Sequence, residues 1–147
     1  MLMKLINLLL IVLFFGIFSC KNPEELVVET VESTPSATIV NDFKAFSNSA
    51  PTGITAVAIK GNKMSLTVQY NGGCQKHTFQ LLGHRMISKS LPPQRSILLF
   101  HDANGDDCRE LVQEVLVFEI SALGYNSEAT TLILEGYEPQ ILFTPVK

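Results

Sequence analysis

A hairpin pattern at residues 54–70 constrains the fold of this chain more than any other sequence feature. Two segments rich in apolar residues, 54–60 and 63–70, are joined by Gly61-Asn62, a two-residue connection that suits the twist of paired strands. In the second segment the apolar side chains occupy every other position: Met64, Leu66, Val68 and Tyr70. A period of two places them on one face of a strand, so the pattern predicts an antiparallel hairpin with one buried face and one solvated face.

Short apolar segments separated by turn residues continue to the end of the chain. We expect strands at 77–82, 86–91, 96–100, 114–120, 130–135 and 140–146. The segments 96–100 and 114–120 are apolar on both faces, which favours central positions in a sheet. The pattern predicts an all-β fold, an antiparallel two-sheet β-sandwich of roughly seven to eight strands, with a small β-barrel as the alternative.

Residues 37–50 allow two interpretations. Ile39, Phe43 and Phe46 recur at a helical spacing, whereas residues 37–40 equally suit a first edge strand. The sequence does not decide between them.

The N-terminus indicates export. A basic start at Lys4 is followed by an apolar run of roughly 14 residues, too short to span a hydrocarbon layer of ~30 Å and typical of a signal peptide. The run closes at Phe18-Ser19-Cys20, which resembles the lipobox variant of Bacteroidetes-type lipoproteins. This resemblance implies a lipidated Cys20 and, because Lys21 follows, an outer-membrane lipoprotein on the periplasmic or surface face. The alternative is an ordinary cleaved signal peptide with an incidental cysteine.

These features give three regions. Residues 1–19 are the expected signal peptide, 20–36 an acylated cysteine with a flexible tether, and 37–147 a single β-domain. The tether is rich in Glu, Thr, Ser and Pro, a composition that cannot bury enough apolar surface to offset its ordering entropy. We expect the N-terminal lipid to attach the domain to a membrane through this tether.

The charge balance excludes a nucleic-acid partner. After removal of residues 1–19, 10 Lys and Arg face 14 acidic residues, so the net charge is near −4. There is no tryptophan and no cluster in which basic and aromatic residues alternate, so phosphate contacts and base stacking have no support.

Two polar loops contain the remaining cysteines. Cys74 lies in the segment 71–77 and Cys108 in the segment 101–108. In an oxidising compartment two such cysteines are expected to form a disulfide. The chain-entropy relation gives a stabilisation of about 3.8 kcal/mol for a loop of about 34 residues, which strain can reduce.

The same loops suggest two kinds of site. His77, His101, Asp102 and Asp106 form a candidate binding surface, because polar residues gather in loops that a disulfide would join. The alternative is a tetrahedral zinc or copper site, whose ligands would be Cys74, His77, His101 and Cys108. A calcium loop of the EF-hand type is excluded, since that motif requires Gly and Glu where this sequence has Asp107 and Gln113.

Enzyme signatures are absent from the sequence. It has no nucleophile elbow, phosphate-binding glycine loop, His-Glu-x-x-His motif or Cys-x-x-Cys pair. We therefore expect no catalytic residues and no cofactor.

The globular part resembles a group of small uncharacterised bacterial exported proteins and lipoproteins. The resemblance covers residues 63–123 and rests on Gly72-Gly73-Cys74-x-x-His77 and His101-Asp102-x-x-Gly105-Asp106-x-Cys108, with Leu91-Pro92-Pro93-Gln94 and Val117-Phe118-Glu119-Ile120-Ser121. It supports the fold and the cysteine pairing and implies no activity. The expected function is that of a non-enzymatic envelope protein that binds a protein, peptide or glycan, or serves a structural role, through loops 71–77 and 101–108.

Overall fold

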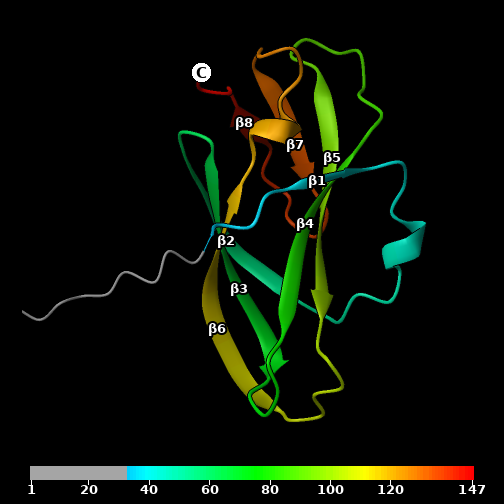
Figure 1. Cartoon of the computed structure of the whole chain (residues 1–147), viewed down its shortest axis with the longest axis vertical. Coiled ribbons are helices and arrows are strands. Elements are labelled where there is room, and N and C mark those ends of the chain that lie inside the picture. The colour runs from blue at the N-terminus through cyan, green and yellow to red at the C-terminus, as the bar shows by residue number, and fades with distance from the viewer. Residues whose placement is uncertain (1–32) are drawn as a thin grey trace, which may run out of the picture. The chain divides into compact units, whose positions relative to one another are not determined.

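The computed structural model describes residues 33–147, so Cys20 and the predicted signal peptide lie outside the described residues. Eight strands form a five-stranded sheet of order β1-β4-β5-β7-β8 and a three-stranded sheet of order β2-β3-β6 (Figure 1). The strands are β1 (Thr38–Val40), β2 (Gly53–Lys60), β3 (Lys63–Gly72), β4 (Thr78–His84), β5 (Gln94–Asp102), β6 (Glu110–Glu119), β7 (Thr130–Leu134) and β8 (Ile141–Phe143). The two short 3₁₀ helices are η1 (Lys44–Phe46) and η2 (Ser121–Leu123). Within residues 33–147 the sheets do not close into a barrel, and the predicted all-β, two-sheet fold is confirmed.

The hairpin that the sequence predicts most clearly is present. β2 pairs with β3 in antiparallel register from Lys60↔Lys63 onward. Met64, Leu66 and Val68 are fully buried, and Tyr70 nearly so. These side chains pack in one core with residues of the five-stranded sheet such as Ile97 and Leu132. The alternation along β3 therefore places the core between the two sheets.

The five-stranded sheet is mixed, which differs from the antiparallel arrangement expected. β1 runs parallel to β4, and β5 runs parallel to β7. Parallel neighbours need a long crossover connection. Here strands of the other sheet provide it, because β2 and β3 lie between β1 and β4 in the sequence, and β6 lies between β5 and β7. No local sequence pattern encodes such a crossover.

β6 occupies the edge of its sheet, whereas the sequence favoured a central position. Val115 and Val117, on its outer face, are 61% and 37% exposed. Part of the free edge is covered by the N-terminal segment: the Ala37 amide donates to the Glu119 carbonyl, and the Glu119 amide donates to the Pro35 carbonyl. Pro35 and Ala37 are thus hydrogen-bonded to the end of β6.

The structure shows the conformation of two segments whose sequence pattern was ambiguous or weak. Residues 37–50 contain both an edge strand, β1, and one turn of 3₁₀ helix, η1, whose first amide is bound by the Asp42 carboxylate. Residues 86–91, expected as a weak strand, form a loop with one isolated bridge, Ser88↔Gln94. Neither described helix has the length or the apolar content to cross a membrane.

β5 contains two buried polar side chains, Arg95 and His101. Its inward side chains are Arg95, Ile97, Leu99 and His101, all 6% exposed or less. A buried apolar centre is thus bounded by a buried cation at one end of the strand and by a buried imidazole at the other. Buried polar groups need hydrogen-bond partners, so both ends require explanation.

Candidate functional site: the disulfide-linked loops

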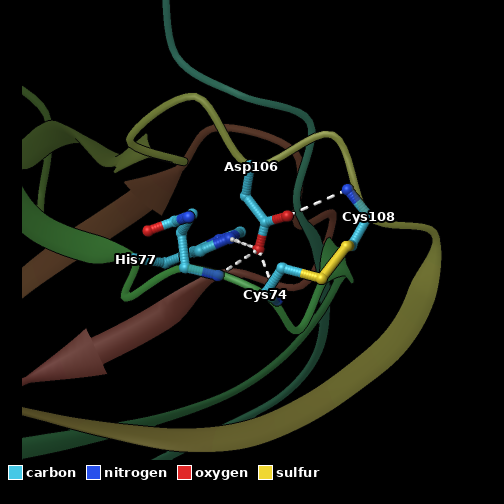
Figure 2. The surroundings of a disulfide bond; sticks show 5 residues. Cys74, His77, Asp106 and Cys108 are labelled. Atoms are coloured by element: carbon cyan, nitrogen blue, oxygen red, sulfur yellow. Dashed lines mark hydrogen bonds and ion pairs between the residues drawn. A yellow bond between two sulfur atoms is a disulfide. The ribbon is translucent and has the colours of Figure 1, made fainter.

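The predicted disulfide between Cys74 and Cys108 is present, with the Cα atoms 5.9 Å apart (Figure 2). Its position follows from the ladder of the three-stranded sheet. β3 ends and β6 begins at the pair Gly72↔Glu110, so the cysteines lie two residues beyond that pair on each strand. The segments that contain them connect the two sheets, from β3 to β4 and from β5 to β6. The disulfide therefore joins two crossovers at one end of the domain.

Asp106 is the centre of this end. Its Oδ2 accepts hydrogen bonds from the backbone amides of Cys74 and Gln75, at 2.9 and 2.8 Å, and its Oδ1 accepts one from the Cys108 amide at 2.9 Å (Figure 2). The amides of Cys108 and Gln75, then that of Cys74, and the His77 side chain hold the pKa of the Asp106 carboxyl well below its usual range. One carboxylate thus fastens both loops independently of the disulfide.

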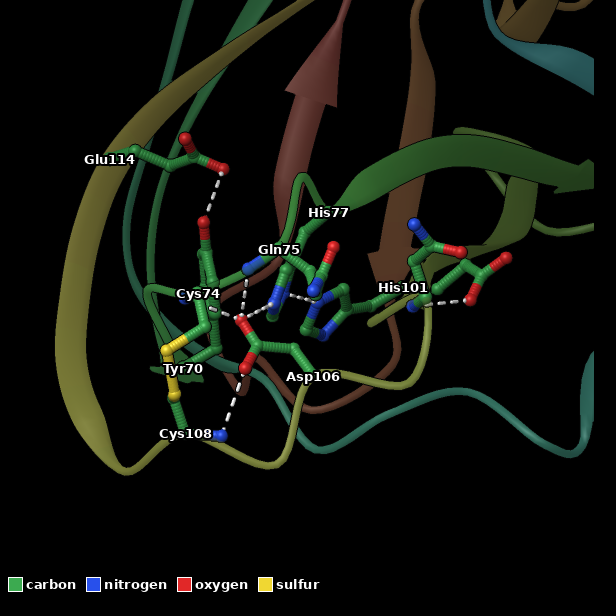
Figure 3. Close-up of polar contacts among 10 residues, drawn as sticks. Tyr70, Cys74, Gln75, His77, His101, Asp106, Cys108 and Glu114 are labelled. Carbon is green, nitrogen blue, oxygen red and sulfur yellow. Dashed lines mark hydrogen bonds and ion pairs between the residues drawn. A yellow bond between two sulfur atoms is a disulfide. The ribbon is translucent and has the colours of Figure 1, made fainter.

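A chain of side-chain contacts leads from Asp106 into the core (Figure 3). His77 Nε2 lies 3.1 Å from Asp106 Oδ2, and His77 Nδ1 lies 2.7 Å from His101 Nε2. His101 Nδ1 in turn lies 2.7 Å from Thr52 Oγ1. An ionised carboxylate only accepts, so we assign the proton of His77 to Nε2. With His101 also protonated on Nε2, every donor in the chain then meets an acceptor, the last being the Thr52 hydroxyl donating to His101 Nδ1.

Burial reinforces the neutral form of His101. The side chain is 1% exposed, and desolvation together with the nearby His77 lowers its pKa below the ordinary value of 6.5. The backbone is held as well, since the His101 amide donates to Ser49 Oγ and its carbonyl accepts from the Ala50 amide. His101 is therefore a packed and fully partnered residue.

Aromatic rings enclose the two imidazoles. The Phe79 ring stacks on His101 with centroids 4.4 Å apart, and the Tyr70 ring lies 4.6 Å from His77 and 4.9 Å from His101. The Tyr70 hydroxyl donates to Glu114 Oε1 at 3.2 Å (Figure 3). Burial and Glu114 raise the pKa of Tyr70 above its usual value, so this donor stays protonated.

The two glycines of the first loop allow this packing. A Cβ on Gly72 would lie 2.6 Å from the His77 ring, so any side chain would displace the imidazole. Gly73 has a φ of +106°, a conformation that residues with a side chain rarely adopt, and a Cβ there would lie 2.9 Å from Glu110. The Gly-Gly-Cys-x-x-His spacing thus encodes a close approach of backbone and imidazole.

The candidate binding residues of the sequence analysis have different places. His77 and Asp106 have side chains that are 2% and 0% exposed, and His101 is equally buried. Asp102 is exposed, and its carboxylate accepts a hydrogen bond from the Asn104 amide within its own turn. The structure brings the two loops together as expected, but three of the four residues lie inside and only Asp102 faces solvent.

The alternative metal site lacks free ligands in the oxidised protein. Both sulfur atoms belong to the disulfide, and His77 uses both ring nitrogens in hydrogen bonds. Side-chain atoms of Cys74, Asp106 and Cys108 do lie within 4.8 Å of one another. A metal at this place would therefore require reduction of the disulfide.

Sequence reasoning missed the partners that complete the cluster. Thr52 and Ser49 lie about fifty positions before His101, and Tyr70 was assigned only to the core. No spacing in the sequence links these residues. Five residues around the buried side chains face solvent: Gln75, Lys76, Asn104, Asp107 and Arg109.

No protein-family model and no curated protein matches this sequence. Among solved structures, a NigD-like immunity protein from Bacteroides caccae has a similar fold, with a TM-score of 0.56 and 14% identity over 77% of this chain. A DUF1344 protein of unknown function from Bacteroides vulgatus matches 78% of this chain with a TM-score of 0.49 and 17% identity. A toxin-related protein from Parabacteroides distasonis matches 74% with a TM-score of 0.48 and 14% identity.

This chain spans 64%, 58% and 59% of the lengths of those three structures, less than two thirds of each. At these identities the likeness to the first structure concerns the fold.

Proposed function

We propose that this chain is a lipid-anchored cell-envelope protein that binds another envelope protein, without catalysis, through the outer residues of the disulfide-linked loops. The observation that carries the proposal is the coordination of Asp106 by amides of both loops, next to the disulfide. Two crossovers that could otherwise move separately are held as one surface. A surface fixed before binding loses little conformational entropy when it meets a partner.

The chemistry of this surface suits a protein partner. Its exposed residues include the cations Lys76 and Arg109 and the anion Asp107, and the described residues offer none of them a partner in an ion pair. Charges that are free in the unbound protein can pair across an interface and orient the partner. The hollow beside Arg85 and the hollow beside Tyr137 are both lined by residues outside these loops, and small ligands prefer concave sites.

The anchor is the second part of the proposal. Cys20 would carry the lipid, and residues 21–34 would connect it to the domain that begins at Pro35. Two or more acyl chains are enough for stable membrane attachment, because each buried methylene contributes about 0.8 kcal/mol. The binding surface would then act at the outer membrane, on the periplasmic or the cell-surface face. An immunity-type role, as in the description of the Bacteroides caccae protein, falls within this class.

The anchor is tested by metabolic labelling with an alkyne analogue of palmitate. The wild-type chain should incorporate the label and partition into the detergent phase of a Triton X-114 extract. The C20A variant should do neither. A C20A chain that labels like the wild type would contradict lipidation at this cysteine.

The surface is tested by placing a photo-crosslinking amino acid at Lys76 in the full chain, expressed in its own bacterium. A discrete adduct with one envelope protein is expected. The same probe at Lys60, an exposed lysine at the end of β2, is the matched control and should give none. D106N should weaken the adduct from position 76 by releasing the loops. Equal adducts from positions 60 and 76 would contradict the assignment of the surface.

A metal-binding role is the second candidate, favoured by the close approach of Cys74, Asp106 and Cys108. A thiol count with and without reductant, combined with elemental analysis of the purified chain, separates the two functions. Two free thiols and stoichiometric zinc or copper would establish the metal site. One disulfide and no bound metal would leave the binding surface as the sole candidate.

A further inference from the structure

A hollow of about 460 Å³ lies at the end of β4 opposite the disulfide, where Arg85 follows the strand. One wall is the loop 85–93 between β4 and β5, and the other is the turn of Tyr125 to Glu128 that precedes β7. The volume falls in the range of small-molecule sites, about 300 to 1,000 Å³. The side chains used below are Arg85, Ile87, Lys89, Pro93, Tyr125 and Glu128.

The charge around this hollow is opposite to that of the protein. Residues 84–95 include three cations, Arg85, Lys89 and Arg95, and no acidic residue, whereas the whole chain has a net charge of −3. Arg85 and Lys89 are exposed, and within residues 33–147 no carboxylate pairs with either. These two cations are therefore free to bind a ligand.

A buried cation adds to the positive potential. Arg95 is 6% exposed and donates to two backbone carbonyls, those of Leu123 and His84, and no described carboxylate neutralises it. His84 is the residue directly before Arg85, so this guanidinium lies under the same end of β4. A charge in a poorly solvated position is screened less than one in water and acts over a longer distance.

The lining also limits the charge of the ligand. Glu128 opposes the two free cations, so the side chains that border the hollow have a net charge of about +1. This balance suits one carboxylate better than a doubly charged phosphate. The apolar part of the wall, Ile87 and Pro93 with the Tyr125 ring at 42% exposure, offers contact to an aliphatic chain or a ring next to that carboxylate.

We propose that this hollow is a binding site for a small ligand with one carboxylate on an apolar or ring-shaped body. Arg85 and Lys89 bind the carboxylate, and Ile87, Pro93 and Tyr125 contact the body. The two sources of such a group are an acidic amino acid of a peptide and a sugar acid. The site is separate from the disulfide-linked loops, and its existence does not depend on the function proposed for them.

Saturation-transfer NMR on the purified full chain tests the site with pairs of probes that differ in charge alone. The α-methylamide of N-acetyl-L-glutamate is compared with the α-methylamide of N-acetyl-L-glutamine for the peptide source, and D-glucuronate with D-glucuronamide for the sugar source. At least one carboxylate should bind with a dissociation constant of about 1 mM, roughly tenfold tighter than its neutral counterpart at low salt. Equal binding within both pairs would overturn the proposal, and so would tighter binding of inorganic phosphate than of either carboxylate.

Variants then locate the site. R85Q/K89Q should weaken carboxylate binding at least tenfold, whereas E128Q should strengthen it by roughly threefold. K60Q/K63Q makes the same charge change at two exposed lysines that flank the β2–β3 turn and should leave the affinity within twofold. All three variants change exposed residues, so circular dichroism should report an intact fold. A loss of affinity in K60Q/K63Q equal to that in R85Q/K89Q would show nonspecific attraction and contradict the site.

Discussion

At each end of β5 a buried polar side chain needs hydrogen-bond partners, and the two ends provide them in different ways. At one end the buried His101 is partnered by side chains, His77 and Thr52, in a chain that reaches Asp106 and the disulfide. At the other end the buried Arg95 is partnered by the backbone carbonyls of His84 and Leu123, and no described carboxylate balances its charge. The first end satisfies its polar groups internally, whereas the second keeps an uncompensated positive charge.

The difference teaches where to look for binding groups. The histidines and Asp106, which look like a site in the sequence, hold the loops in place, and what remains free for a partner is the exposed rim around them. The loop 85–93, which carries no histidine or cysteine, leaves Arg85 and Lys89 unpaired beside a hollow. Polar residues that gather in a sequence are thus not the same as polar residues that are free in the structure.

Among the changes at the two ends of β5, loss of the disulfide should lower the free energy of unfolding the most. C74S/C108S should lower the free energy of unfolding by up to about 3.8 kcal/mol, because the unfolded chain is no longer constrained. Urea unfolding of the variant, and of the wild type with reductant, measures the change. A wild-type midpoint that reductant leaves unchanged would contradict a stabilising disulfide.

Replacement of His101 should cause the second-largest loss in the free energy of unfolding. H101A leaves a cavity beside Phe79 and removes hydrogen-bond partners from His77 and Thr52, at a cost of about 3 kcal/mol. The matched change D102A, at the exposed neighbouring residue, should cost less than about 1 kcal/mol. Chemical unfolding of both variants decides whether the cluster is structural. Near-equal small effects would instead return His101 to the group of binding residues.

Replacement of Arg95, at the other end of β5, should lower the free energy of unfolding less than replacement of His101. R95M keeps most of the side-chain volume and removes a cation that has no described carboxylate partner, leaving two carbonyls without a donor. The expected cost is about 1 to 2 kcal/mol, measured in the same urea titration. If R95M destabilised the domain more than H101A, the ranking of the two ends would be reversed.

Acid should destabilise the end of β5 that contains His101. Because the pKa of His101 is lower in the folded protein than in the unfolded one, the unfolded chain binds more protons once the pH falls below about 6.5. Stability is therefore expected to decrease as the pH drops from that value towards the folded pKa. Asp106, whose folded pKa is also lowered, extends the loss below its unfolded pKa, about 3.9.

NMR titration of the histidine Cε1–H signals checks this directly. The His101 signal should start to shift at a lower pH than that of an unfolded control peptide. A signal that titrates at 6.5 or above would contradict a desolvated neutral imidazole.

The sequence predicted what depends on local pattern. Alternation at Met64 to Tyr70 predicted the hairpin and its buried face, and the cysteines of loops 71–77 and 101–108 predicted the disulfide. It did not predict the parallel pairs β1–β4 and β5–β7, because their crossovers run through the other sheet. Nor did it predict that β6 is an edge strand, because apolar side chains on its outer face imitate a central strand.

The sequence identified the loops of the candidate site but not the roles of the residues within them. Both loops were identified, yet the burial of His77 and His101 depends on Thr52, Tyr70 and Phe79, which the chain brings together only on folding. The hollow beside Arg85 had no signal in the sequence, since it is formed by a loop and a distant turn.

The most direct test of the account measures amide hydrogen exchange at Cys74, Gln75 and Cys108 in the wild type and in D106N. These three amides lie in loops, outside the strands, and donate to one carboxylate. They should exchange slowly in the wild type and lose protection together in D106N, while the amides of β3 keep theirs. Fast exchange of the three amides in the wild type, or unchanged protection in D106N, would contradict the claim that Asp106 fastens the two loops.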